Sequence, residues 1–386
     1  MFSLKSFLSK NNVLPLILAL LLFLKCRPYF VWGWNELLLA SLSLVIAFIE
    51  LSKIDIKDRN RLIAFTVLLL AYFLISFLRG ARMGAIIYIS LAFIPFMKYD
   101  FFMQVYESFK SILAIVLCLS LGSLVLVLTG VLTPSGVIEA LNDLKDYAYV
   151  QYFMLVIPTH VSDTFARFCS VFDEPGVVGT MCSLILIAED FRFKDKRNIA
   201  FLVSGMLSFS LFFYMIVVIY LLLRSGIKGK IGWVAAILIF YIATRNTELF
   251  YDRIWSRLEF GGSGLIEGNN RNSDALLDIW DRYKFTPGIM FGYGDRFVKD
   301  FYESASIQLF ILRDGFVFVF LYFYSFYKLM CAHISSKRNI LIYLAVMFLT
   351  LYQRPGFCES DFTLLITAII IANSSKNVSI NNCSQL

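Results

Sequence analysis

The chain has 386 residues, of which 59% are hydrophobic and 17% aromatic, and its formal net charge is +7. With a mean hydropathy of +0.73, this composition excludes a soluble globular domain and indicates a polytopic membrane protein. Most Lys and Arg residues lie in short connections between apolar runs, where they set membrane orientation, so nucleic acid is not an expected partner. The seven cysteines include no Cys-x-x-Cys pair and predict neither a zinc site nor a disulfide framework.

Apolar runs recur along the chain, and a helix needs about 20 residues to cross the hydrocarbon core of a bilayer. The runs lie at 13–31, 36–52, 62–78, 83–97, 111–131, 175–190, 199–223, 231–244, 305–327, 339–352 and 360–373. We therefore predict an all-α, polytopic transmembrane helical bundle of about twelve crossings, forming one integral membrane domain over residues 1–386. Two long periplasmic loops, 132–174 and 245–304, and a short disordered cytoplasmic tail, 374–386, complete the expected topology.

Basic residues decide the expected orientation. The basic clusters are Lys53–Arg61, Lys98–Lys110, Arg192–Arg197, Arg224–Lys230 and Lys328–Arg338. The positive-inside rule places all of them in the cytoplasm, together with both chain ends. The run 199–223 satisfies this rule only if it turns back near Gly205–Ser210, because a single helix would export the cluster that follows it. Each half would then be shorter than a full span, so the sequence leaves open whether this run is one helix or a hairpin.

The first candidate site is the stretch Arg167–Gly179, which carries charge to the start of an apolar run. Glu174 precedes Pro175, a favourable first residue for a helix, and an acidic side chain is stabilised by the partial positive charge of a helix N-terminus. Ionisable residues next to lipid are costly and usually kept for function. An acidic helix cap and a contact with substrate are therefore equally good interpretations of Glu174.

The second candidate site is the arginine-rich loop 245–304. Arg253 and Arg257 are four residues apart, so a helical segment would direct both guanidinium groups to one side, which suits bidentate phosphate contacts. Gly292 and Gly294 would let backbone N–H groups approach an anion closely. The other candidate residues of this loop are Arg271, Trp280, Tyr293 and Arg296. The aromatic side chains suit sugar stacking and equally suit anchoring at the membrane interface, and a solvated basic loop is the alternative to an anion-binding one.

Charged residues also lie in or next to the late apolar runs. Glu303 precedes one run, Arg313 and Asp314 lie within it, and Arg354 follows the next one. Arg313 and Asp314 are equally well explained as a structural ion pair or as functional groups.

Spaced motifs fill the second half of the chain. They are Gly-x-x-Arg271, Trp280, Pro287, Gly292-Tyr293-Gly294, Glu303–Ser306 and Arg313-Asp314-Gly315. Together they resemble the polymerase and ligase superfamily of bacterial surface polysaccharides. The Phe-x-Glu-Pro core at 172–175 is similar to the O-antigen polymerases, the Wzy group, and Gln353-Arg354-Pro355 fits the same group. The resemblance extends from about residue 160 to residue 356.

This resemblance implies an O-antigen polymerase in the bacterial inner membrane. Such an enzyme moves the growing chain from undecaprenyl diphosphate onto the incoming lipid-linked repeat unit, at the periplasmic face and with inversion. The resemblance implies no metal, nucleotide sugar or other cofactor. The implied partners are lipid-linked glycans, membrane lipid and a chain-length regulator of the same pathway.

The reaction needs cations that stabilise the departing diphosphate and a base that accepts a proton from the attacking sugar hydroxyl. Arg271 matches the phosphate-binding arginine of the superfamily. The further residues expected to contact diphosphate or sugar are Arg167, Arg253, Arg257, Arg296, Arg354, Tyr293 and Trp280. Ligase-like members carry a histidine where this chain has Tyr302-Glu303-Ser304, so the base is expected to be Glu174 or Glu303.

Two other functions stay open. A ligase that moves finished polymer onto lipid A core shares the chemistry but not the acceptor, and the missing histidine weighs against it. A flippase or another transporter belongs to a different class, which commonly shows paired repeats and charges in mid-helix. This chain has no evident repeat and its charges cluster in loops, which favours the polymerase.

Overall fold

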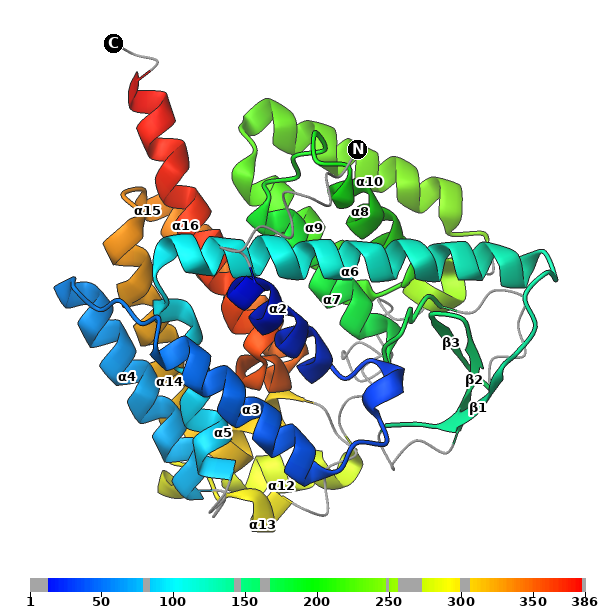
Figure 1. Ribbon diagram of the computed structural model, residues 1–386. Helices are drawn as coiled ribbons and strands as arrows, with labels where there is room; N and C mark the ends of the chain where they lie inside the picture. Colours follow the sequence, from blue (N-terminus) through cyan, green and yellow to red (C-terminus); the bar gives the residue numbers. More distant parts are fainter. Residues whose placement is uncertain are drawn as a thin grey trace.

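A computed structural model describes residues 13–78, 84–141, 147–159, 167–247, 250–255, 273–298 and 306–383. Within these residues the chain forms fourteen α-helices and one small sheet, so the predicted helical class is confirmed (Figure 1). The first half contains α2 (Val13–Lys25), α3 (Glu36–Leu51), α4 (Arg59–Leu78), α5 (Gly84–Leu91) and α6 (Tyr99–Leu128). The second half contains α7 (Pro175–Ala188), α8 (Arg197–Leu207), α9 (Leu211–Arg224), α10 (Ile227–Thr244), α12 (Asp274–Tyr283), α13 (Asp295–Val298), α14 (Ile307–His333), α15 (Lys337–Gln353) and α16 (Asp361–Cys383).

Four helices of the described residues are long and apolar enough to cross a membrane: α4, α6, α10 and α14. The prediction of about twelve crossings is therefore too high. Most of the other apolar runs form helices, or apolar parts of helices, of only 10–17 residues. At 1.5 Å per residue, the 14 residues of α7 extend about 21 Å, which is less than the hydrocarbon core of a bilayer.

The first long loop contains a sheet, so the prediction of an all-α fold is wrong at this place. Strands β1 (Gly136–Glu139), β2 (Ala148–Tyr152) and β3 (Leu155–Pro158) pair in antiparallel order β1-β2-β3. Val150 of β2 lies opposite Val137 of β1 and Ile157 of β3. These short segments are rich in β-branched and aromatic residues, which favour a pleated, half-buried surface. Figure 1 shows the sheet below the C-terminal end of α6.

The run 199–223 is divided into α8 and α9 by a turn at Ser208–Ser210, so of the two alternatives left open by the sequence the structure shows the one with a turn. Phe209 adopts a left-handed φ of 45° in this turn. Both Ser208 and Ser210 are buried, and α7 packs against α8 and α9. The protein thus covers the turn, as an interruption of a helix at membrane depth requires.

The second long loop is partly helical and docks onto α14. It contains the π-helical segment η4 (Tyr251–Trp255), α12, the 3-10 helix η6 (Pro287–Met290) and α13. Leu276 of α12 and Val298 of α13 are fully buried in a cluster with Leu312 of α14. Apolar side chains spaced along this loop therefore fix its C-terminal part to the helical body.

The last helix continues to Cys383, beyond the point at which the sequence analysis expects a disordered tail. The segment 374–386 contains no Gly or Pro. Its Ser and Asn residues weaken a helix by only tenths of a kcal/mol each, which does not stop a helix that begins in the packed core. Figure 1 shows this end of α16 projecting from the body.

Two long helices from opposite halves of the chain form a close pair. α4 packs along α14, and the buried Ser325 of α14 donates a hydrogen bond to the carbonyl oxygen of Ala64 at 2.7 Å. Tyr72 of α4, fully buried, donates to the carbonyl oxygen of Cys358. Cys358 belongs to η8 (Pro355–Glu359), the 3-10 helix between α15 and α16. These contacts place η8 beside the pair formed by α4 and α14.

The basic clusters contact one another, as expected if they share one side of a membrane. The N–H group of Lys98 donates to the carbonyl oxygen of Lys53 at 2.7 Å. Lys110, which is fully buried, forms ion pairs with Glu189 at 3.0 Å and with Asp195 at 2.8 Å.

Further contacts extend this network to the remaining clusters. Arg224 pairs with Asp190 at 2.9 Å, and Arg338 donates to the carbonyl oxygen of Leu223 at 2.7 Å. We call the region at the C-terminal end of α7, where the basic clusters meet their acidic partners, the basic end. Its basic side chains are Lys110, Arg197 and Arg224, and their acidic partners are Glu107, Glu189, Asp190 and Asp195.

Candidate functional site

Glu174 directly precedes α7 and forms an ion pair across the fold. Its backbone is extended, with φ −143° and ψ 140°, and its side chain makes no capping hydrogen bond. The carboxylate oxygen Oε2 instead lies 2.9 Å from Nη2 of Arg354, which follows α15. The Glu174 side chain is 40% exposed and that of Arg354 is 18% exposed. The side chain therefore does not serve as a hydrogen-bonding cap, and a molecule in solvent can reach it.

Gly176 makes the close approach of Arg354 possible. A Cβ atom at position 176 would lie 1.8 Å from Nη2 and 2.9 Å from Cζ of Arg354. The guanidinium also lies over the ring of Phe357, 5.6 Å from its centroid, which restricts its orientation. Nε of Arg354 has no hydrogen-bond partner among the described residues. An arginine has five N–H donors, so the ion pair with Glu174 does not use all of them.

Gly179, one turn further along α7, admits the turn between α8 and α9. A Cβ atom at this position would lie 2.4 Å from Cβ of Ser210. Arg167 holds the same turn, since its Nε donates to the carbonyl oxygen of Ser208 at 3.2 Å and its Nη2 to that of Phe209 at 3.0 Å. Residues three apart lie on one face of a helix, so this turn and Arg354 border the same face of α7. We call this constellation the α7 N-terminal site, and it consists of Arg167, Glu174, Gly176, Gly179 and Arg354.

Backbone contacts fix the segment that leads into α7. Tyr149 of β2 donates to the carbonyl oxygen of Asp173. The N–H group of Val156 of β3 donates to the carbonyl oxygen of Ser170 at 2.9 Å, and Ser170 itself has a left-handed φ of 55°. The sheet that the sequence analysis did not foresee therefore helps to position Glu174.

The connection from α15 to α16 joins this site to a second group of charges. Arg313 lies 2.9 Å from Oδ2 of Asp314 and 3.0 Å from Oε1 of Glu359, the last residue of η8. Asp314 is fully buried. The expected ion pair between Arg313 and Asp314 is therefore present, and Glu359 extends it.

The Gly292-Tyr293-Gly294 motif serves backbone packing. Gly315, with φ 81° and ψ 163°, interrupts the helical conformation within α14, and the motif lies against this break. The N–H groups of Tyr293 and Gly294 donate to the carbonyl oxygens of Leu312 and Arg313 at 2.8 Å and 3.0 Å. Because these two N–H groups already donate to carbonyl oxygens of the protein, the expectation that the motif binds an anion through its backbone N–H groups is wrong.

The other candidates of the second loop lie on the α14 side or outside the described residues. Trp280 and Tyr293 are half-buried and Arg296 is exposed. Tyr293 packs against the rings of Tyr283 and Phe297, with centroid distances of 5.1 Å and 4.7 Å. The candidates outside the described residues are Arg257, Arg271 and Glu303, and only the backbone of Arg253 is described.

The sequence analysis missed the part played by three residues of this region. Gly176 and Gly179 are three positions apart at the start of an apolar run, and this spacing is the signal for close contacts on one helix face. Glu359 carries no local signal, because its partner Arg313 is distant in the chain.

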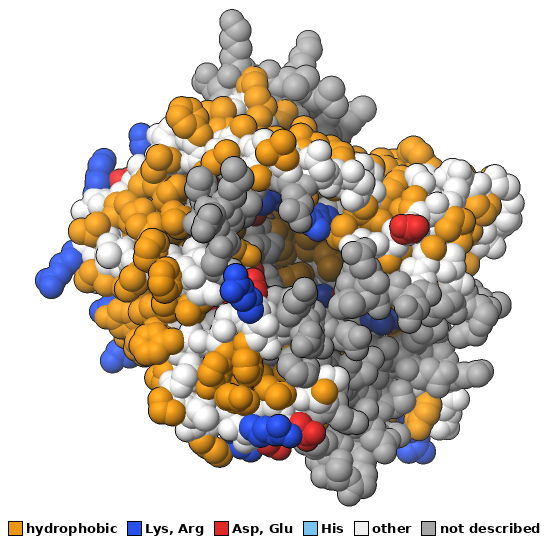
Figure 2. All heavy atoms as spheres, turned by 90° about the horizontal axis from the view of Figure 1, so that it is seen from below, with side chains coloured by type: hydrophobic (Ala, Val, Ile, Leu, Met, Phe, Trp, Pro, Cys, Tyr) orange, Lys and Arg blue, Asp and Glu red, His pale blue; other side chains and the backbone are white. Residues whose placement is uncertain are grey.

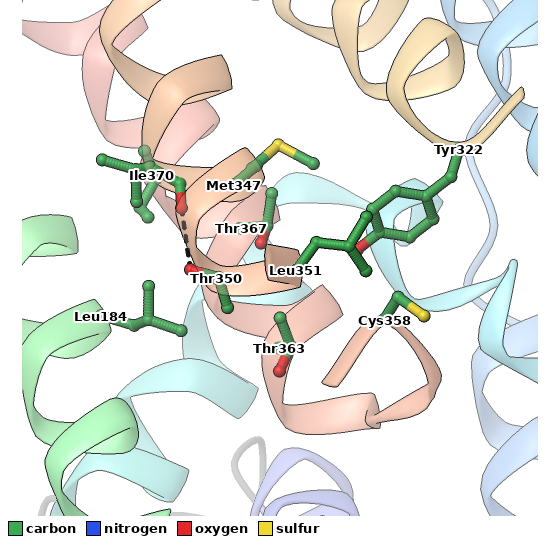
Figure 3. A pocket seen from close by; sticks show the side chains of 10 residues that line it. Leu184, Tyr322, Met347, Thr350, Leu351, Cys358, Thr363, Thr367 and Ile370 are labelled. Carbon is green, nitrogen blue, oxygen red and sulfur yellow. Dashed lines mark hydrogen bonds between the residues drawn. The ribbon is translucent and has the colours of Figure 1, made fainter. Parts of the chain in front are cut away.

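An internal cavity of about 20 Å³ lies between α7, α14, α15 and α16, next to η8. Figure 3 shows Thr350 of α15 and Thr363 and Thr367 of α16 among its lining residues. This volume holds about one water molecule. The cavity is therefore too small for a sugar or a polyprenyl chain.

The surface seen from below is hollowed near its centre (Figure 2). Lys and Arg side chains, with Asp or Glu beside them, lie in and around the hollow. Helices α12 and α13 lie at this lower end of the molecule in Figure 1.

Among the described residues no group of three or more His, Cys, Asp or Glu side chains is arranged to hold a metal ion. Comparison of the chain with protein-family models, curated proteins and solved structures gave no match in any of the three.

Proposed function

We propose that this chain is an O-antigen polymerase of the bacterial inner membrane, which joins undecaprenyl-diphosphate-linked repeat units by inverting glycosyl transfer. The observation that supports this proposal most strongly is the Glu174–Arg354 ion pair at the start of α7, with Arg167 bound to the turn that packs on the same face of α7. A reachable carboxylate next to guanidinium groups suits proton removal from an acceptor and stabilisation of a leaving diphosphate.

The distribution of charge along α7 favours a periplasmic position for this site. The basic end lies at the C-terminal end of α7 and the ion pair of Glu174 at its N-terminal end, and the 14 residues between them extend about 21 Å. The positive-inside rule assigns the basic end to the cytoplasm, with both chain termini on that side. The N-terminal end of α7 then points towards the periplasm, where the lipid-linked substrates are used, although α7 by itself is shorter than the hydrocarbon core.

In the proposed reaction, Glu174 accepts the proton of the attacking sugar hydroxyl as the new bond to the anomeric carbon forms. Arg354 favours the ionised form of this carboxylate, which is the form that accepts a proton. The bond between the anomeric carbon and the diphosphate breaks on the opposite face, and the diphosphate departs with the bonding electrons. Arg354 and Arg167 compensate its charge.

The second loop supplies the remaining groups of the proposal. Arg271 contributes the phosphate contact that the resemblance implies, and Glu303 is the alternative base. The further cations and stacking rings are Arg253, Arg257, Arg296, Trp280 and Tyr293. A chain-length regulator of the same pathway is the proposed protein partner.

Purified protein in lipid nanodiscs, supplied with the undecaprenyl-diphosphate-linked repeat unit and no added metal, tests the proposal. A ladder of products spaced by one repeat is the expected result, and Glu174→Gln is expected to abolish it. Product formed only when lipid A core is added identifies a ligase, and movement of the lipid across vesicles without bond formation identifies a transporter. Either result contradicts the proposal.

A further inference from the structure

A second buried charged cluster lies where α2, α3 and α16 meet. Lys25, at the end of α2, and Asp361, at the start of α16, form an ion pair with 2.5 Å between Nζ and Oδ2. Their side chains are only 15% and 6% exposed. Glu50 of α3 is fully buried and lies close enough to interact electrostatically with both of them.

Three of the four carboxyl oxygens of this cluster lack a hydrogen-bond donor among the described residues. Both Oε atoms of Glu50 and Oδ1 of Asp361 are buried and have no hydrogen-bond partner among the described residues. The thiol of Cys26, which also reaches the cluster, donates to the carbonyl oxygen of Leu22 at 3.4 Å. Tyr72 of α4 lies near Asp361, but its hydroxyl donates to the carbonyl oxygen of Cys358.

The balance of charges decides which side chains of this cluster are ionised. If all three side chains were ionised, two carboxylates would share one ammonium group and leave one uncompensated negative charge away from water. Such a charge is among the most costly features a protein interior can hold, and proteins commonly remove it by taking up a proton. A proton also converts one carboxylate oxygen into a donor, which can satisfy one of the unpartnered acceptors.

We propose that Lys25, Glu50 and Asp361 form a proton-binding site, in which Glu50 holds one proton at neutral pH beside the Lys25–Asp361 ion pair. The ion pair uses the charge of Lys25, so Glu50 is the carboxyl group that stays neutral. Loss of the proton sets Glu50 in competition with Asp361 for Lys25, and this weakens the contact that joins the start of α16 to α2. The site does not depend on the proposed polymerase activity.

Infrared spectroscopy of the purified full chain tests this site, because a protonated carboxyl group has a C=O stretching band separate from that of a carboxylate. At pH 7 the wild-type spectrum is expected to contain a buried carboxyl band that Glu50→Gln removes. Glu139→Gln, at an exposed position of β1, is the matched control and is expected to leave the band unchanged.

Two further variants separate charge balance from a merely structural role. Asp361→Asn makes Glu50 the sole counter-ion of Lys25, so the Glu50 band is expected to disappear although Glu50 is still present. Lys25→Met leaves no ammonium group, so both carboxyl groups are expected to take up protons and the band to grow about twofold.

A band that Glu50→Gln leaves unchanged overturns the proposal, and so does a band that persists in Asp361→Asn. The spectra are first recorded in a buffer that contains a choline salt and then in one that contains the sodium salt at the same pH. Loss of the band in the sodium buffer would show that the cluster binds a metal cation in place of the proton, and it would overturn the proposal.

Discussion

The two ends of α7 use charged residues in different ways. At the basic end, Lys110 contacts two carboxylates, and Arg197 contacts Asp195 at 2.5 Å and Glu107 at 2.8 Å. At the other end, Glu174 is 40% exposed in its pair with Arg354, and Nε of Arg354 has no hydrogen-bond partner among the described residues. A buried cation that contacts two carboxylates, as Lys110 does, stabilises the fold, whereas a carboxylate that solvent can reach, such as Glu174, suits a ligand.

The largest effect is expected on the stability of the fold, when the buried cation of the basic end is removed. Lys110→Met leaves Glu189 and Asp195 without a central partner, and breaking a buried ion pair costs about 3 kcal/mol or more. Thermal unfolding in detergent measures this loss. The double variant Lys110→Met/Glu189→Gln is expected to recover part of it, and equal midpoints for Lys110→Met and wild type would contradict a stabilising role for this end.

Glu174→Gln tests the opposite end. It keeps the size of the side chain but removes the proton acceptor, and loss of a general base lowers a rate by about 100-fold or more. The length distribution of lipopolysaccharide in a strain that depends on this protein measures the change, and core capped by a single repeat is expected. Glu139→Gln is the control, and a full ladder with Glu174→Gln would remove this residue from the reaction.

Gly176→Ala displaces Arg354 without changing any charge. The added Cβ would lie 1.8 Å from Nη2, so the guanidinium must move, and polymerisation is expected to fall by about tenfold or more. Gly122→Ala in α6 is the matched control, because no atom lies within 4 Å of a Cβ there. Equal activity of the two variants would show that the position of Arg354 is unimportant.

Lowering the pH is expected to give the smallest of these effects, a gradual loss of stability at the basic end. Burial disfavours the charged form of Asp195, but hydrogen bonds from Arg197 and Lys110 outweigh it and hold the pKa of this carboxyl well below its usual value. A group with a lowered pKa in the folded state stabilises the fold above its usual pKa, about 4, and this contribution is lost as the pH falls further. Unfolding midpoints between pH 6 and pH 3 are expected to fall less steeply for Asp195→Asn than for wild type, and parallel curves would contradict this.

Local patterns in the sequence predicted the helical class and, for the run 199–223, left open a single helix or a hairpin, of which the structure shows two helices joined by a turn. They overestimated the number of crossings, because hydropathy marks apolar runs but not where each helix ends. They also missed the sheet, whose three strands gain stability only by pairing with one another. Short strands of this kind have weak individual signals.

The candidate site was predicted in part. Glu174 and Arg354, which were both candidates because they carry charge next to apolar runs, form an ion pair, whereas their role and that of Arg167 in binding substrate stay predictions. The pairing of Glu174 with Arg354 and the function of Gly292 and Gly294 depend on contacts between distant segments. No local pattern records such contacts.

Side-specific labelling tests the central claim that the start of α7 faces the periplasm and binds a lipid diphosphate. The seven native cysteines are replaced by alanine, and one cysteine is introduced at exposed Gly356, where no atom lies within 4 Å of a Cβ. A membrane-impermeant maleimide is expected to label Gly356→Cys in intact spheroplasts, and undecaprenyl diphosphate to slow this labelling in the purified protein. Lys194→Cys, in the loop between α7 and α8, is expected to react only after permeabilisation. Labelling of Gly356→Cys only after permeabilisation, or at a rate that the lipid does not change, would contradict the claim.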